Sequence, residues 1–326
     1  MNHLTVSVII PAYNVAQWLP RCLDSILRQT HRTLEIVIID DGSTDETFEI
    51  MDRYAVRDRR IKAFHQENNG VTSARLRGIA EASGEWVGFV DGDDEIEPDM
   101  YERLLGNALK YDAEISHCGY QMCFSDGRVN YFHNTNVLEK QDKITALREL
   151  LSGERVEPGL CNKLFHKSLF EGLSMPTDIK INEDLLMNYY LFSAANQTVF
   201  HDWCPYHYIV RCTSASRSKL NKHKIYDPLR VKEIILEAAP DELRLAAQKA
   251  LVNTCVYSYC GLVQQTEYDV CQAKQDLRGK LKEHYDWCQM LPKRTKLLAM
   301  LIIYAPKLFE FIYPIYTRHF QNSQYT

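Results

Sequence analysis

The chain has 326 residues, of which 45% are hydrophobic and 25% charged, a composition typical of a globular protein with one large domain or two. Its formal net charge is −5, so the surface as a whole lacks the positive field with which proteins bind nucleic-acid phosphates. The composition therefore argues against a nucleic acid as partner.

The N-terminus and the cysteines predict a protein of the cytoplasm. The first five residues contain no basic segment that leads into an apolar run, as a secretory signal does. The ten cysteines form no CxxC pair and no regular framework, so we expect reduced core thiols rather than disulfides or a zinc site. The apolar stretch at 297–316 is interrupted by two prolines, a lysine and a glutamate, which argues against a membrane-spanning helix.

The first hundred residues alternate short apolar runs with helical patterns, which is typical of βαβ units and a mostly parallel sheet. Runs that are apolar at successive positions and rich in β-branched residues predict strands buried on both faces. These runs span residues 6–10, 35–39, 61–64 and 86–90.

Helices are predicted between these strands. Apolar residues recur at helical spacing over 18–27. Ser43, with Glu46 three residues later, matches a capping box and predicts the start of a second helix. A third helix is expected after Gly70, and a fourth near Pro98, a residue that suits a first helical turn.

The remaining two thirds of the chain show two further patterns. Residues 112–220 are irregular in pattern, with a strand predicted at 114–118 and a helix at 183–192. We expect this region to build the acceptor side of the binding site. The last hundred residues are helical in pattern and carry no chemical motif. We therefore predict two halves of one sheet-containing domain and a helical C-terminal region, with the boundaries 1–111, 112–220 and 221–326.

Polar residues follow three of the predicted strands, at the edge where open α/β sheets bind ligands. A tyrosine ring at a strand end can stack on a nucleobase, and carboxylates beside it can accept hydrogen bonds from a base or ribose. The alternative for the first two clusters is a strand exit with an Asx turn and a helix cap. The clusters are Pro11-Ala12-Tyr13-Asn14, Asp40-Asp41-Gly42-Ser43-Thr44-Asp45 and Asp91-Gly92-Asp93-Asp94.

The third cluster places three carboxylates within four positions. Such close negative charges repel each other unless a cation compensates them, and oxygen ligands of this kind suit Mg²⁺ or Mn²⁺ that also contacts substrate phosphates. The alternative is a solvated acidic turn that caps the helix near Pro98. The strand that precedes the cluster favours the metal site.

The order and spacing of these motifs resemble GT-A glycosyltransferases of family 2. The resemblance rests on the PxYN strand end, the DDGSxD turn and the DxD element, and it is strong over residues 4–110. It extends more loosely to residue 218, where Asn182-Glu183-Asp184 before two leucines is similar to the ED element of that family. It implies a GT-A fold with a Rossmann-like central sheet flanked by helices.

The resemblance also implies a binding site for the nucleotide of the donor. Tyr13 would stack on uracil and Asp41 would bind the base. Arg75 would approach the nucleotide, and Asp91 would lie at the ribose or the metal. The donor-binding residues would be Pro11, Tyr13, Asn14, Asp41, Arg75, Asp91 and Gly92.

Catalysis in this family implies a single displacement with inversion. Asp184 would act as the general base that takes the proton of the acceptor hydroxyl, and Glu183 would orient the acceptor. Asp93 would ligate a divalent cation that stabilises the leaving diphosphate, with Asp94 as the alternative ligand. The alternative for Glu183 and Asp184 is a pair of acids favoured by the dipole of a helix N-terminus.

Two basic residues are further candidates for the acceptor side. Lys163 lies in an NKLF segment similar to one that lines the acceptor site in related enzymes, but a lysine at a strand edge is commonly structural. His207 follows the aromatic residues of 203–206 and would contact phosphate, together with a loop at 211–216. The alternative is an aromatic core strand followed by a polar loop.

The segment 293–318 combines apolar and aromatic residues with basic flanks, a pattern that suits a membrane interface. It predicts peripheral contact with the inner face of the cell membrane. The alternative is packing on the catalytic domain or in a homodimer.

The sequence thus predicts a metal-dependent, inverting hexosyltransferase. It would move sugar from a UDP-sugar to a glycan or polyprenyl-linked saccharide in bacterial surface polysaccharide synthesis. A sugar nucleotidyltransferase is one alternative, although its first strand normally leads into a glycine-rich phosphate loop and not into Pro11-Ala12-Tyr13-Asn14. A non-catalytic subunit that binds a glycan or a nucleotide-sugar is another, against which Asp93 and Asp184 argue.

Overall fold

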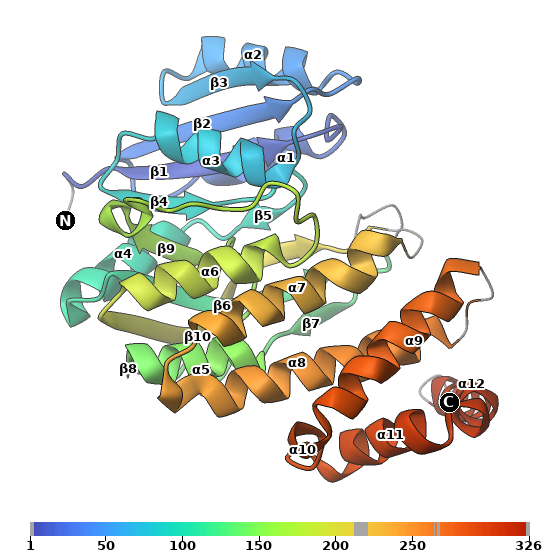
Figure 1. The fold of residues 1–326 in the computed structure, drawn as a ribbon. Coiled ribbons are helices and arrows are strands. Elements are labelled where there is room, and N and C mark those ends of the chain that lie inside the picture. The colour runs from blue at the N-terminus through green and yellow to red at the C-terminus, as the bar shows by residue number, and fades with distance from the viewer. Residues whose placement is uncertain (1–2, 212–220, 264, 266–267, 324–326) are drawn as a thin grey trace. The chain divides into compact units, whose positions relative to one another are not determined.

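The computed structural model describes residues 3–211, 221–263, 265 and 268–323, and the chain divides into two compact units. The first, Met1–Lys219, contains a β-sheet with helices, and the second, Leu220–Thr326, is helical (Figure 1). We describe each unit by itself.

The described strands of the first unit form one ten-stranded sheet in the order β3-β2-β1-β4-β9-β6-β10-β5, with β7 paired to β6 and β8 to β10. Strands β1 to β4 are parallel neighbours, as are β6 and β10, whereas β9 enters antiparallel between β4 and β6. The predicted α/β fold is confirmed. The strands are β1 (Val6–Ala12), β2 (Leu34–Asp41), β3 (Ile61–Gln66), β4 (Trp86–Phe89), β5 (Glu95–Ile96), β6 (Ile115–Cys123), β7 (Val129–Tyr131), β8 (Leu138–Asp142), β9 (Lys163–His166) and β10 (Gln197–Ile209).

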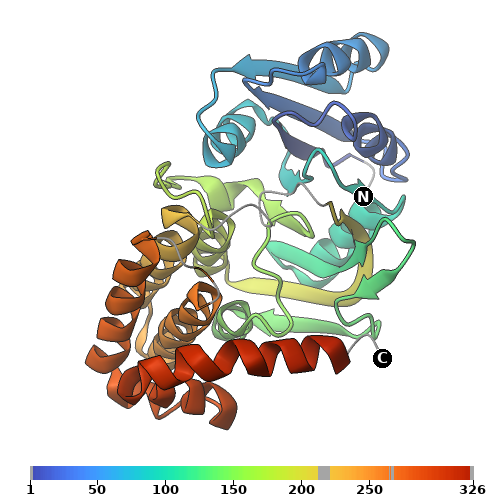
Figure 2. The ribbon, with the colours of Figure 1, turned by 90° about the vertical axis from the view of Figure 1, so that its right-hand side faces the viewer.

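Helices cover both faces of this sheet (Figures 1 and 2). A Cβ at Gly78 of α3 would lie 2.3 Å from Cγ2 of Ile9, and a Cβ at Gly88 of β4 would lie 2.6 Å from the Tyr101 ring of α4. Gly88 pairs with Val8, whose side chain points away from that of Ile9, so α3 and α4 lie on opposite faces. The helices are α1 (Leu19–Leu27), α2 (Thr47–Arg57), α3 (Val71–Glu81), α4 (Met100–Tyr111), α5 (Lys143–Ser152), the 3₁₀ turn η1 (Lys167–Phe170) and α6 (Glu183–Ala194).

The capping box predicted at Ser43 is wrong. Helix α2 begins at Thr47, whose backbone N–H donates to Oδ1 of Asp45 at 3.0 Å. The hydroxyl of Ser43 instead accepts the backbone N–H of Asn14 at 2.9 Å, which ties the end of β1 to the end of β2. A contact with a residue far away in sequence therefore replaces the local cap.

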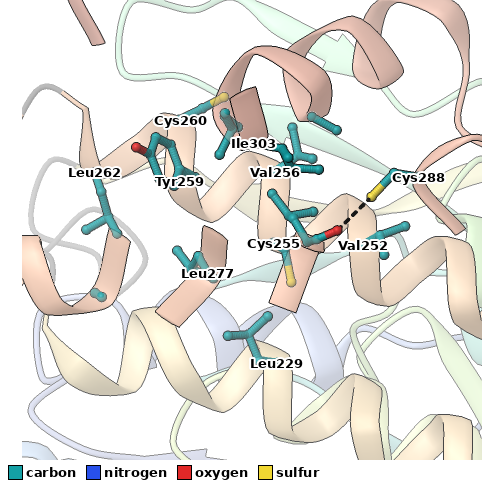
Figure 3. Close-up of a cluster of buried hydrophobic side chains, with 14 of the residues drawn as sticks. Leu229, Val252, Cys255, Val256, Tyr259, Cys260, Leu262, Leu277, Cys288 and Ile303 are labelled. Carbon is teal, nitrogen blue, oxygen red and sulfur yellow. Dashed lines mark hydrogen bonds between the residues drawn. The ribbon is translucent and has the colours of Figure 1, made fainter. Parts of the chain in front are cut away.

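The second unit packs six described helices around its own apolar core (Figure 3). Side chains of α7, α8, α9 and α11 meet there, among them Leu229, Val256, Leu277 and Ile303. None of the helices in the described part of the chain is long and apolar enough to cross a membrane. The helices are α7 (Lys222–Ala238), α8 (Asp241–Leu262), α9 (Tyr268–Glu283), α10 (Tyr285–Cys288), α11 (Lys293–Tyr304) and α12 (Pro306–Ser323).

The described cysteines are free thiols, and most of them are core residues. Cys271 is exposed and Cys123 is partly buried, whereas the other seven are buried. Their burial agrees with the expectation of core thiols.

A buried carboxylate joins three strands and a loop at the end of the sheet where β1 begins. Glu35 of β2 accepts hydrogen bonds from the Ser7 hydroxyl at 2.5 Å and from the Ser83 backbone N–H at 2.7 Å, and pairs with Lys62 of β3 at 2.5 Å. Burial opposes ionisation, but the hydrogen bonds from Lys62, Ser7 and Ser83 outweigh it and lower the pKa of Glu35 to about 2.

We expect Glu35→Ala to lower the free energy of unfolding by about 2 kcal/mol at pH 7, because three partners lose their acceptor. A carboxyl whose pKa is lower in the folded protein than in the unfolded chain stabilises the fold at pH values above its unfolded pKa. The loss of unfolding free energy in the variant should therefore shrink as the pH falls from about 4.5 toward 2. Urea unfolding at a series of pH values measures it. Glu49→Ala, at an exposed position of α2, is the control, and equal losses in the two variants would contradict the prediction.

Candidate functional site

The ends of β1 and β2 are joined by a set of hydrogen bonds. Asn14 has a φ of 52°, in the left-handed region that asparagine tolerates, and its Oδ1 accepts the Thr44 backbone N–H at 2.8 Å. Oδ2 of Asp45 accepts the backbone N–H of Ala16 at 3.1 Å. Asn14 therefore holds the first two predicted clusters together.

A cavity of about 250 Å³ lies beside these strand ends. It brings together Pro11, Tyr13 and Asp41 of the predicted donor site, and Tyr13 is 50% exposed. The other lining residues come from the loop after β3 and from α3. They are Asn68, Gly70, Val71 and Ala74, and Ala12 of β1 completes the lining.

Asp41 shapes this cavity because it holds the loop that forms one wall. Its Oδ1 accepts the backbone N–H of Asn69 at 2.9 Å and Nε2 of Gln66 at 2.7 Å, and its Oδ2 accepts the backbone N–H of Gly70 at 2.8 Å. The conformation of Gly70, with a φ of 88°, favours glycine. Asp41 thus lines the cavity with its carboxylate already bound to protein donors, and its contact with a base stays a prediction.

Arg75 of α3 connects the third cluster with the acidic pair of α6. Its side chain is only 7% exposed, and it lies 3.4 Å from Oδ1 of Asp91 and 3.1 Å from Oε1 of Glu183. Burial alone would lower the pKa of Arg75, but the carboxylates of Asp91 and Glu183 raise it, so the guanidinium is charged. Residues predicted from separate stretches of the chain therefore meet at one buried cation.

The acids at the start of α6 hold their protons more tightly than ordinary carboxyls. Burial and the neighbouring Asp184 raise the pKa of Glu183 to about 7, against the opposing effect of Arg75. Burial also raises the pKa of Asp184, and the backbone N–H of Leu185 donates to its Oδ1 at 2.7 Å. A carboxyl with such a raised pKa can exchange a proton near neutral pH.

The third cluster packs against the first, and its acids Asp93 and Asp94 contact different residues. A Cβ at Gly92 would lie 3.2 Å from Cγ2 of Val15, which shows how closely this turn approaches the chain after β1. Asp93 forms an ion pair with Arg211, whose guanidinium lies over the Trp18 ring at 4.3 Å.

Asp94 fastens the turn to β10. Its Oδ2 accepts the Tyr206 hydroxyl at 2.6 Å and its Oδ1 accepts the Ile209 backbone N–H at 2.8 Å. Burial and the charge of Asp91 raise the pKa of Asp94 to about 8. Asp94 therefore serves the fold here, which favours Asp93 over Asp94 as a metal ligand.

Lys163 is also engaged by the fold. It is fully buried, and its Nζ donates to the carbonyls of Glu157 and Gly159 at 2.7 and 2.6 Å and to Oδ1 of Asn162 at 2.7 Å. A lysine has three donors, so none remains for an acceptor. Asn188, one turn after Asp184, donates to the same Gly159 carbonyl at 3.0 Å. These contacts agree with the alternative interpretation, in which Lys163 is a structural residue. Its ammonium group holds the loop that precedes β9.

His207 lies on β10 and faces Glu97, with 2.9 Å between Nε2 and Oε1. The aromatic stretch around it is a strand, as the alternative interpretation held. Most of the loop predicted to close over the diphosphate, residues 212–216, lies outside the described residues, so that contact stays a prediction.

Asp91 and Asp93 are the acids that would hold a divalent cation if one shared its coordination with a diphosphate. Among the residues described, no three histidine, cysteine or acidic side chains are grouped as a metal cage. Mg²⁺ is commonly held by one or two carboxylates together with substrate phosphates, and Asp91 and Asp93 offer this number. In this structure Asp91 pairs with Arg75 and Asp93 pairs with Arg211, so each carboxylate lies next to a positive charge.

Three residues of the site carry contacts that sequence reasoning did not assign. They are Arg211 on Asp93, Tyr206 on Asp94 and Asn188 on the loop before β9. Tyr206 belongs to the aromatic stretch and Arg211 begins the loop predicted at 211–216, but neither was assigned a contact with an acid, and Asn188 lies within a mostly apolar helix. A polar residue within that apolar run was the one available signal.

Comparisons with known proteins agree on one family. The model of glycosyl transferase family 2 matches residues 7–173. Glycosyltransferase GlyA of Streptococcus pneumoniae is 31% identical over 289 residues, which are 85% of this chain and 41% of GlyA. The uncharacterized glycosyltransferase EpsJ of Bacillus subtilis is 36% identical over 202 residues, 60% of this chain and 58% of EpsJ. This chain therefore spans less than two thirds of either relative.

Solved structures share the fold at lower identity. The crystal structure of S. aureus TarS 1-349 in complex with UDP-GlcNAc matches with a TM-score of 0.71 and 19% identity. The match covers 98% of this chain and 92% of that one, so the similarity of fold extends over nearly the whole length.

We expect Arg75→Met to lower the free energy of unfolding by roughly 3 kcal/mol at pH 8, because it leaves the buried carboxylate of Glu183 and the partly exposed carboxylate of Asp91 without their cation. Losing that cation raises the carboxyl pKa values further, so the variant binds protons over a wider pH range and its deficit should grow as the pH rises from 6 to 8. Thermal or urea unfolding at both pH values measures the effect. Arg57→Met, at an exposed position of α2, is the control, and a deficit independent of pH would refute the proposed network.

Proposed function

The chain belongs to glycosyl transferase family 2, and from this premise we propose that it moves a sugar from a UDP-sugar to an acceptor hydroxyl, with inversion at the anomeric carbon. One observation carries the proposal. The cavity lined by Tyr13 and Asp41 borders α3, and from this helix Arg75 reaches both Asp91 and Glu183. The proposed nucleotide pocket and the proposed catalytic carboxylates would therefore share α3 as one wall.

Asp184 is the general base of the proposed reaction. The acceptor hydroxyl loses its proton as its oxygen attacks the anomeric carbon, and an ionised carboxylate within hydrogen-bond reach can take that proton. The Leu185 backbone N–H orients Asp184, and its neighbour Glu183 is held by Arg75. Glu183 then orients the acceptor, while the positive charge of Arg75 lowers the pKa of both acids against the effect of burial and so favours their ionised forms.

Charge on the leaving UDP is the second requirement of the reaction. Asp91 and Asp93 would hold Mg²⁺ or Mn²⁺, which when bound supplies the positive charge that stabilises the leaving diphosphate. Arg75 and Arg211 are the cations that this chain itself places beside those two acids. Tyr13 and Asp41 bind the uracil at the cavity.

The donor and acceptor are proposed as classes. TarS, which shares the fold, was solved with UDP-GlcNAc, so UDP-GlcNAc is the first donor to test. The acceptor is a glycan or a polyprenyl-linked saccharide of a surface polysaccharide, met on the cytoplasmic side of the membrane. The homology to glycosyltransferases such as GlyA supports the reaction class.

The experiment measures release of UDP from a panel of UDP-sugars with Mg²⁺ or Mn²⁺. We expect Asp184→Asn to lower turnover about 10²- to 10⁴-fold, because the base is lost. Asp93→Asn should weaken the protection that metal and donor together give against thermal unfolding. Asp52→Asn, at an exposed position of α2, is the matched control. Release of pyrophosphate instead of UDP would indicate a nucleotidyltransferase, and protection without turnover would indicate a binding subunit.

The pH dependence gives an independent prediction. We expect kcat/KM to fall as the pH is lowered, with an acidic limb above the pH range of an ordinary aspartate, because burial raises the pKa of Asp184 and a protonated Asp184 accepts no proton. Glu183→Gln removes a neighbouring negative charge, so it should lower the pKa of Asp184 and move the acidic limb to lower pH. An acidic limb at the same pH in both proteins would exclude this coupling.

A further inference from the structure

Helix α12 has two apolar sides, and the fold of its own unit uses one of them. On the inner side, Phe309 is 2% exposed and its ring centroid lies 6.0 Å from that of Tyr259 in α8. On the outer side, four large side chains follow the spacing i, i+3, i+4, i+7 of a helix face, with exposed fractions between 47% and 71%. They are Leu308, Phe311, Ile312 and Ile315.

Helix α11 repeats this arrangement. Ala299, Ile302 and Ile303 are buried in the core of the unit, whereas Leu297 is 59% exposed and Tyr304 is 68% exposed. We call the exposed residues of both helices the outer stripes. A cavity of about 340 Å³ lies between them. Its lining residues are Tyr257, Arg294, Leu297, Leu298, Leu301, Leu308, Phe309, Ile312 and Tyr313.

The charge around the outer stripes is positive. Between residues 293 and 315 the chain has four basic side chains, those of Lys293, Arg294, Lys296 and Lys307. The one acid in this segment is Glu310, whose carboxylate accepts the Tyr259 hydroxyl at 2.7 Å and lies 3.6 Å from Lys274. Glu310 is therefore compensated within the unit, and the lysines give the apolar surface a cationic border.

We propose that the outer stripes bind the surface of a bilayer that contains anionic phospholipid. Figure 2 shows α12 along its length. The two helices would lie in the plane of the interface, with Phe311 and Ile315 among the acyl chains and the lysines at the headgroups. Since no described helix can cross a membrane, the contact is peripheral.

A second copy of the chain is the less suitable occupant. A two-fold contact through the outer stripes would bring two identical patches together, so that the cationic borders of both copies, with Lys293, Lys296 and Lys307, would lie at one interface. Such like charges repel across an interface, whereas anionic headgroups attract them. The proposal extends the proposed function, because a polyprenyl-linked acceptor lies in the same bilayer, but the binding itself needs no transferase activity.

The test is flotation of the full chain with vesicles of phosphatidylcholine, either pure or with about 30% phosphatidylglycerol. We expect at least about tenfold stronger binding to the anionic vesicles, weakened several-fold by about 0.5 M salt. The double variant Phe311→Ser/Ile315→Ser should bind at least about tenfold more weakly, because it removes two anchors. Lys293→Glu/Lys296→Glu should abolish the preference for anionic lipid while leaving the apolar surface intact.

Controls separate binding from folding and from catalysis. Phe311 and Ile315 are exposed, so unfolding temperatures should match the wild type, and Leu245→Ser at an exposed position of α8 should bind vesicles as the wild type does. Asp184→Asn should also bind normally, which distinguishes failure of this proposal from failure of the proposed function. Absence of wild-type binding to anionic vesicles, or equal binding by the Phe311→Ser/Ile315→Ser variant, would overturn the proposal. A dimer that this variant dissociates, without vesicle binding, would assign the surface to a second copy.

Discussion

A buried guanidinium is the constraint on which the arrangement of the site depends. Arg75 is almost fully removed from solvent, and an unpaired charge in such a place is costly by several kcal/mol. Its partners, Asp91 after β4 and Glu183 at the start of α6, lie on different elements and are far apart in sequence. The fold is therefore stable only when α3, the end of β4 and the start of α6 come together, which is also the arrangement that the proposed chemistry needs.

Residues of the same chemical type have different roles in this protein because their side chains contact different partners. Asp93 and Asp94 are neighbours in one turn, yet Asp93 meets Arg211 while Asp94 is bound by Tyr206 and a backbone N–H of β10. The same holds for cations. Lys163 uses all three donors to fix the loop before β9, whereas Arg75 directs its charge at the acids beside the cavity. Residues of one type are thus divided between fold and site.

Much of the fold and the centre of the site could be predicted from local pattern. Strands β1, β2 and β4 are rich in buried apolar residues, and Tyr13, Asp41 and Asp91 stand at their ends. Strand β3, in contrast, contains Lys62 and His65 and is buried mainly at Ile61. The cap at Ser43 failed because that hydroxyl is bound by Asn14, which is distant in sequence. The antiparallel entry of β9 was also beyond local pattern, because a strand of four residues carries no signal for its neighbours.

The sequence by itself determined which residues can do chemistry and at which strand ends they stand, because apolar periodicity and motif spacing are local properties of the chain. Only the tertiary structure decided which of those residues are available. Lys163 uses its three donors on the loop that precedes it, and Asp94 accepts hydrogen bonds from two groups of β10, while Arg211 after β10 pairs with Asp93. Hydrogen bonds and ion pairs of this kind depend on distances in space, and the order of residues does not encode them one by one.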